Sequence, residues 1–261
     1  MNIMNGWSSR YGLKDQPIES SLPGDFSPDR TTKQETGILM VTAKENDTKM
    51  SRSALRRIRE KEQRFKTILS AAETLFARKG YNQTSIEEIA DMAEVSTGSV
   101  YFYFKNKEDL LIKLMQEIGY YLRKLLGEEL RKTDFSLNSL QHIAFAFLRD
   151  FCLNHPEKIT IFFRESVGQS AEVEDQRKEL FIKLTSEIRD AVLKISEGLG
   201  KRFVTESSPE LIAVCIVGIY ERIACHYLLW QDRSEDMMDI AGETSSFMLG
   251  GVSNLFSQDE T

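Results

Sequence analysis

The stretch from residue 84 to residue 107 constrains the chain most, because it predicts two short helices joined by a tight turn. Thr84 or Ser85 can cap the first helix with a side-chain oxygen, and two glutamates follow in the first turn, where carboxylates suit the positive end of the helix dipole. Ser96 can cap the second helix, and Val100 and Phe104, four residues apart, can anchor it. The remaining side chains of the second helix include several that face outward: Thr97, Gly98, Ser99, Tyr101, Phe102 and Tyr103.

A short helix that presents hydroxyl groups and aromatic rings to water suggests a binding surface. The major groove of DNA admits such a helix, and hydroxyls and ring edges can contact bases and phosphates. Lys105 and Lys107 follow at once and can neutralise phosphates. The alternative is an ordinary helical hairpin whose aromatic rings are partly buried.

The residues around this hairpin match a longer pattern. The sequence reads ILSAAETLFARKGY at 68–81, TSIEEIA at 84–90 and VSTGSVYFYFKNKEDLL at 95–111. In this run, which spans residues 65–111, the chain resembles the TetR/AcrR family of bacterial transcriptional regulators.

The resemblance implies a role in DNA contact for each exposed position. Ser85 would hold a phosphate, Phe102 would offer an apolar contact such as to a thymine methyl group, and Lys107 would hold a phosphate at the start of the next helix. The remaining implied contacts are to base edges or the adjoining backbone by Thr97, Gly98 and Ser99, and to phosphates by Tyr101, Tyr103 and Lys105.

The charge distribution fits a polyanionic partner although the net charge is −6. Residues 50–110 carry 11 Lys and Arg against 9 Asp and Glu, whereas residues 111–261 carry 17 against 24. The basic excess is densest between residues 52 and 66. An acidic body behind a basic edge orients a protein toward DNA.

Helical periodicity without clean alternation predicts an all-α protein. We expect helices at 51–79, 84–93, 97–107, 108–132, 137–154, 157–168, 173–198, 208–230 and 234–256. Ser208 is expected to cap its helix, with Pro209 in the first turn. Residues 1–49 are interrupted by Gly, Ser and Pro, which predicts a disordered extension. Residues 50–108 are then the helix-turn-helix DNA-binding domain, and residues 109–261 a larger helical domain for effector binding and dimerisation.

The last two predicted helices are apolar on more than one face, so one subunit is not expected to cover both. Small residues recur in the last helix and would let another helix approach closely. The family resemblance implies that this pair forms a four-helix bundle with its symmetry mate. A two-fold homodimer suits a palindromic operator.

The C-terminal helices are rich in aromatic residues, which predicts a pocket for a mostly apolar effector. A fatty acyl group is the ligand that an arginine among phenylalanines suggests. The alternative is plain core packing. The candidate effector-binding residues are Phe147, Phe151, Phe163, Arg164, Tyr220 and His226.

Enzyme chemistry finds little support. The three histidines lack the spacing of a metal site, no glycine loop that cradles phosphate is present, and no cofactor is predicted. No apolar run is expected to approach the ~18 residues of a membrane span, so we expect a cytoplasmic protein without a membrane partner. The sequence predicts a ligand-responsive repressor released from its operator by a small hydrophobic effector. The alternatives are a helical small-molecule-binding protein without sequence-specific DNA binding and an all-helical enzyme.

Overall fold

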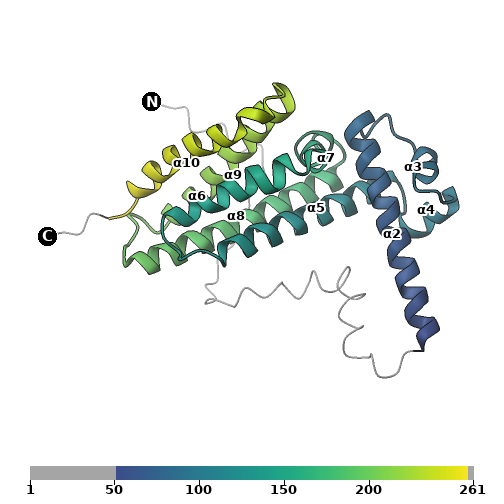
Figure 1. Cartoon of the computed structure of the whole chain (residues 1–261), viewed down its shortest axis with the longest axis horizontal. Helices are drawn as coiled ribbons and strands as arrows, with labels where there is room; N and C mark the ends of the chain where they lie inside the picture. The colour runs from purple at the N-terminus through teal and green to yellow at the C-terminus, as the bar shows by residue number, and fades with distance from the viewer. Residues whose placement is uncertain (1–50, 258–261) are drawn as a thin grey trace. The chain divides into compact units, whose positions relative to one another are not determined.

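The computed structural model describes residues 51–257, so the predicted extension at 1–49 lies outside the described residues. Residues 52–58 begin the first described helix, and residues 59–257 belong to one compact unit, within which all contacts given below lie. Every regular secondary-structure element among the described residues is a helix. The only β-pairing in that range is an isolated bridge between Phe203 and Phe256. Figure 1 shows the helices with their labels. The α-helices are α2 (Arg52–Lys79), α3 (Ile86–Met92), α4 (Thr97–Tyr103), α5 (Lys107–Leu130), α6 (Asn138–Phe145), α7 (Pro156–Thr160), α8 (Ala171–Leu199), α9 (Ser208–Ile223) and α10 (Met237–Ser253).

The helix-turn-helix prediction is confirmed, because α3 and α4 are short helices with side-chain caps. Ser85 accepts a hydrogen bond from the Glu88 N–H, and Glu88 accepts one from the Ser85 N–H, which is a capping box. Ser96 caps α4 by accepting from the Ser99 N–H at 3.2 Å. Glu94 turns the chain between the two helices with a left-handed φ of 54°.

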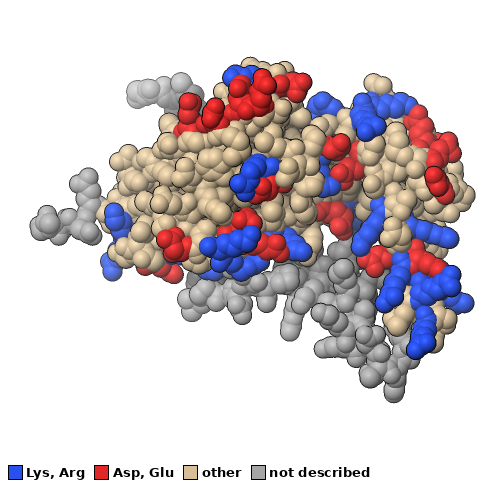
Figure 2. Space-filling model, in the orientation of Figure 1, with Lys and Arg blue, Asp and Glu red and all other residues tan. Residues whose placement is uncertain are grey.

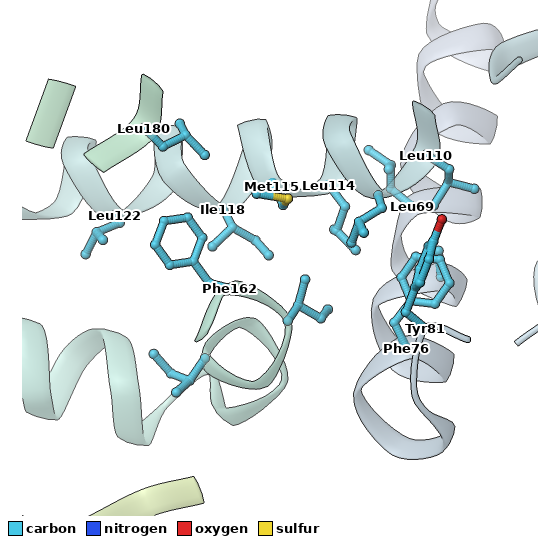
Figure 3. Packing of buried hydrophobic residues seen from close by; sticks show 14 of the residues in the cluster. Leu69, Phe76, Tyr81, Leu110, Leu114, Met115, Ile118, Leu122, Phe162 and Leu180 are labelled. Carbon is cyan, nitrogen blue, oxygen red and sulfur yellow. The ribbon is translucent and has the colours of Figure 1, made fainter. Parts of the chain in front are cut away.

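One hydrophobic core runs from the head formed by α2–α4 into the body formed by the later helices. Val100 and Phe104 are buried, as their spacing predicted. Figure 3 shows the core following α5 from Leu110 to Leu122, with Phe76 and Tyr81 near one end and Leu180 near the other. Helix α5 therefore joins the head to the body through continuous side-chain contact.

Helices α5 and α8 of the body pack closely against each other. A Cβ added to Gly119 would lie 2.7 Å from Leu180 Cδ2, so glycine lets the leucine approach the helix backbone. The Gln116 amide donates to Gln176 Oε1 at 2.7 Å, and Arg123 Nε donates to Glu187 Oε1 at 2.8 Å. The two helices are thus fixed by both shape and polar pairs.

Three of the predicted helices differ from expectation because each ends in a π-helical segment. These segments are η2 (Ala146–Leu153) after α6, η3 (Ile161–Glu165) after α7 and η4 (Ala224–Trp230) after α9. At the end of η3 the Ser166 N–H donates to Ile161 O at 3.0 Å, a bond that spans five residues instead of four. Such wide turns are rare and recur at functional sites.

The ends of the last two helices also correct the prediction. Ser208 is the first residue of α9 and does not cap it; its hydroxyl instead accepts from the Thr205 N–H at 3.2 Å. The final helix begins at Met237 after a short 3₁₀ turn, η5 (Ser234–Asp236), and ends at Ser253. It ends early because Phe256 pairs with Phe203, their rings stacked 4.8 Å apart.

The stretch Ser208–Trp230 is long and apolar enough to cross a membrane, judged by length and composition only. This corrects the expectation that no apolar run approaches such a length. Only 28% of its most apolar window is buried. Leu211, Val214 and Trp230 are each more than half exposed, so the stretch presents an apolar face.

Candidate DNA-binding surface and effector site

Helix α4 presents the predicted DNA-contacting side chains on its exposed face. Tyr101 is 53% exposed and Phe102 is 70% exposed, although both are large apolar groups. Tyr103 is half-buried and lies edge-on to Phe65 at 6.2 Å, while Phe104 stacks on the same ring at 5.2 Å. Buried neighbours therefore fix the helix, and the two exposed rings are left for a partner.

The start of α4 offers hydroxyl groups beside an open backbone. The hydroxyls of Ser96 and Ser99 lie 2.8 Å apart, and a Cβ added to Gly98 would meet nothing closer than Ser96 Oγ at 3.9 Å. Thr97 is half-buried at the first helical position. A shallow cleft runs between this end of α4 and helix α2, lined by Arg64, Ser96, Gly98, Ser99, Phe102 and Tyr103.

Basic residues of α2 lie beside the exposed rings. The Lys61 ammonium is 5.4 Å from the centroid of the Phe102 ring, a cation–π distance. Figure 2 shows Lys and Arg side chains gathered over α2. Helix α2 therefore places positive charge beside the exposed Phe102 ring of α4.

Ser85 keeps a hydroxyl donor although it caps α3. Its oxygen accepts from the Glu88 N–H at 3.2 Å, which leaves the hydroxyl proton available. Glu88 also pairs with Lys79, and the hydrogen bond from Lys79 is the main reason that the pKa of the Glu88 carboxyl is lowered. The Glu88 carboxylate of this capping box is therefore ionised near neutral pH.

Lys107 has a different environment from the one that the sequence suggested. Its ammonium donates to Tyr81 O at 2.9 Å, Thr84 O at 3.0 Å and Asn82 O at 3.4 Å, and it lies 4.5 Å from the Tyr81 ring centroid. An ammonium has three donors, so all three are used within the protein. Burial lowers the pKa of Lys107. The neighbouring Lys105 is exposed, and its ammonium has no partner among the described residues.

The head is joined to the body by polar contacts from α7 and η3. Glu165 accepts from the Tyr81 N–H at 2.8 Å, and Lys158 contacts Glu73 at 2.7 Å. Arg164 is half-exposed, pairs with Glu165 at 2.8 Å and donates to Ala77 O at 3.4 Å. The prediction that Arg164 lies among the phenylalanines is therefore corrected. It lies at the joint, because its side chain leaves the helix on a different side from Phe162 and Phe163.

The predicted effector residues fall into separate groups. Phe147 and Phe151 stack at 5.9 Å, and Tyr220 lies edge-on to Phe147 at 6.2 Å, with its hydroxyl 3.2 Å from Ser245 Oγ. Phe163 belongs to a second group with Phe162 and Phe181.

His226 joins neither of these two aromatic groups, and its place in an effector pocket stays a prediction. It is half-buried, its Nε2 lies 3.0 Å from the Gln231 amide, and its ring contacts Trp230 edge-on.

A further residue at the second aromatic group, Arg177 of α8, was missed by the sequence analysis. Its guanidinium carbon is 5.5 Å from the Phe181 ring centroid, and its side chain is 14% exposed. It sits in a charged run that resembles a solvated helix face. The spacing of four residues between Arg177 and Phe181 is the signal that could have found it.

Comparison with known proteins agrees with this arrangement. The family model described as bacterial regulatory proteins, tetR family, matches residues 68–114. The fatty acid metabolism regulator protein of Bacillus subtilis (strain 168) is 24% identical over 200 residues, covering 76% of this chain and 100% of that protein. The crystal structure of the transcriptional regulator FadR from Bacillus subtilis in complex with stearoyl-CoA covers 72% of this chain and 98% of that one, with a TM-score of 0.64 and 19% identity. FadR from Bacillus halodurans gives a TM-score of 0.63 at 23% identity, over 72% and 98% of the two chains.

The matched region contains α3, α4 and the start of α5, so it includes the exposed face of α4 and both lysines that follow. The similarity to solved structures extends over the body and gives the same helical fold. Residues 68–114 therefore match the tetR family of bacterial regulatory proteins, and the rest of the described chain shares its helical fold with the solved structures.

Proposed function

We propose that this protein is a ligand-responsive transcriptional regulator that represses its targets by binding a palindromic operator as a homodimer. The observation that carries the proposal is helix α4, which exposes two aromatic rings and a row of small polar groups beside the basic residues of α2. Exposed aromatic rings rimmed by polar and basic residues are typical of an interaction site. The relatives are regulators, in keeping with a binding protein rather than an enzyme.

In the proposed complex, α4 enters the major groove. Thr97, Gly98 and Ser99 lie against base edges or the adjoining backbone, and Phe102 contacts a thymine methyl group. Phosphates are held by Ser85, Tyr101, Tyr103 and Lys105. Since the ammonium of Lys107 is used by three carbonyl groups, its phosphate contact is assigned to its main-chain N–H at the first position of α5.

The dimer is proposed to form through α9 and α10. Phe247 of α10 is 73% exposed, and Leu211 and Val214 of α9 are 54% and 52% exposed. Open space lies beyond Gly218, Gly250 and Gly251, so a second pair of helices can approach closely. A second copy of the chain would bury this face, which accounts for the apolar stretch at 208–230 without a membrane. The protein then acts in the cytoplasm, where its operator is.

The proposed effector is a small molecule with a long apolar chain, of the fatty acyl type. The aromatic groups of the body support this, and a relative of the same fold has been solved with stearoyl-CoA. The effector would favour a body conformation in which the two heads are wrongly spaced for two half-sites, so its differential affinity releases DNA. Segment η3 suits this coupling because Phe163 faces the body while Glu165 holds the head.

The test is selection of bound sequences from a random duplex pool at near-physiological salt, followed by titration of the selected operator with acyl ligands. We expect a palindrome to be enriched and operator affinity to fall when ligand is present. Equal operator affinity with saturating ligand would reject the ligand response. A folded dimer that enriches no sequence would favour the alternative of a helical ligand-binding protein without DNA recognition.

A further inference from the structure

Arg177 carries an unsatisfied donor in the interior of the body. Its Nε is buried and has no hydrogen-bond acceptor among the described residues. The nearest carboxylate oxygen is Glu174 Oε2 at 3.8 Å, which is too far for a hydrogen bond. The other oxygen of Glu174 accepts from the Gly168 N–H at 2.8 Å, so this carboxylate is held elsewhere.

Other arginines of the body, by contrast, form close ion pairs with carboxylates. Arg123, Arg149 and Arg189 each place a guanidinium nitrogen within 2.8 Å of a carboxylate oxygen. A buried donor without an acceptor loses its hydration and gains nothing in return, which is why nearly all such groups in folded proteins are paired. Arg177 is therefore the body's clearest candidate for a group that is completed by a ligand.

The surroundings of Arg177 suit the apolar part of that ligand. The Phe181 ring below the guanidinium is 5.4 Å from Phe162 and 6.4 Å from Phe163, which both belong to η3. Burial and the nearby Glu221 carboxylate raise the pKa of the Cys225 thiol in η4, and the positive charges of Arg222 and Arg177 oppose that rise. Phe181, over which Arg177 lies, thus packs against the π-helical segment η3, and wide turns of this kind are typical of functional sites.

We propose that the Nε–H of Arg177 binds the acceptor oxygen at the polar end of an acyl effector, while Phe162, Phe163 and Phe181 contact its hydrocarbon chain. The acceptor is either the carboxylate of a free fatty acid or the thioester carbonyl of an acyl carrier, since both present an oxygen at the end of an apolar chain. This inference rests on the proposed ligand response and names the anchor that the response requires.

The position of the anchor explains how binding would reach the head. Phe162 and Phe163 are followed directly by Arg164 and Glu165, which contact Ala77 O and the Tyr81 N–H. A ligand that separates Phe181 from η3 would displace these two contacts with it.

The experiment compares the full chain with three variants. Arg177→Met keeps the length of the side chain and removes its donors and charge, and Arg177→Lys keeps the charge but lacks the Nε–H. Arg189→Met is the matched control, because Arg189 lies on the same helix and pairs with Asp190 at the surface. Binding of palmitate, palmitoyl-CoA and coenzyme A is measured by calorimetry, together with operator affinity and thermal unfolding.

We expect the wild type and Arg189→Met to bind one acyl ligand, and both Arg177 variants to bind it about ten- to a hundred-fold more weakly with unchanged operator affinity. Palmitate and palmitoyl-CoA separate the free acid from the thioester. Arg177→Met is also expected to unfold at the same or a higher temperature, because a buried donor without a hydrogen-bond acceptor is removed; a merely structural arginine would lower it. Wild-type affinity in both Arg177 variants would overturn the inference. A wild type that binds its operator but no acyl ligand would also overturn it and leave DNA binding intact, whereas loss of operator binding would count against the proposed function itself.

Discussion

Lys105 and Lys107 are two residues apart but have different environments. Replacing each in turn separates a lysine that contacts DNA phosphate from one that stabilises the head. Lys107→Met removes an ammonium that donates to three carbonyl oxygens and lies over the Tyr81 ring. A hydrogen bond with a charged partner contributes about 1.5–3 kcal/mol, and an exposed cation–π contact about 0.5–1 kcal/mol. Because the site is partly solvated and freed carbonyls regain water, we expect a total loss of about 2–3 kcal/mol. For a chain of this length that lowers Tm by roughly 4–12 °C.

Lys105→Met is the matched change, since that ammonium is exposed and has no partner among the described residues. Its removal is expected to leave Tm within about 1–2 °C and to reduce the slope of log affinity against log salt by about 0.9 per subunit, or ~1.8 for the dimer. Lys107→Met is expected to leave that slope unchanged. The assays are thermal unfolding and operator binding at several salt concentrations. If Lys107→Met flattens the slope while Tm stays constant, its ammonium contacts a phosphate and the internal assignment is refuted.

Three further changes test the joint, the dimer and the pH response. Glu165→Ala removes the acceptor of the Tyr81 N–H, so we expect ligand to change operator affinity several-fold less than in the wild type; an unchanged ratio of affinities with and without ligand would exclude this route. Phe247→Glu places a charge on the exposed face of α10, and sedimentation is expected to show monomers that bind the operator at least tenfold more weakly, whereas an intact dimer would move the interface elsewhere. Burial and the nearby Lys158 lower the pKa of His155, whose Nε2 lies 2.9 Å from the Tyr121 hydroxyl. Since the unfolded chain then binds a proton more readily than the folded one, stability is expected to fall as pH drops from the unfolded value of about 6.5 toward the lowered pKa, and His155→Gln should flatten that decline in urea unfolding between pH 7 and 5.

Much of the fold could be predicted because its signals are local. Ser85 and Ser96 cap helices in the structure as their positions indicated, and Gly80 and Gly200 adopt left-handed φ values of 93° and 64° at helix ends. A helix cap forms between residues only a few positions apart, so it can be predicted from the local sequence. The division at residue 108 between a DNA-binding and an effector domain stays a prediction.

The parts that failed depend on contacts between distant residues. Arg164 follows two phenylalanines in sequence, but successive residues of a helix diverge by about 100°, so its neighbours in the chain are not its neighbours in space. From the sequence alone, Lys107 is expected to be a surface lysine. In the structure its ammonium is covered because the loop at 81–84 folds against it. Arg177 was overlooked for the same reason, because only the packing of α8 against other helices buries its Nε.

The π-helical segment η3 has a consequence of its own. A wide turn holds one residue more than an α-turn, so the segment contains a latent shift of register. If the bond from Ser166 to Ile161 were replaced by the usual one to Phe162, the residues around that turn would rotate by about 100° relative to those on its other side. The Glu165 carboxylate would then no longer accept the hydrogen bond from the Tyr81 N–H. The hydrogen-bond register of η3 therefore determines whether Glu165 contacts the head.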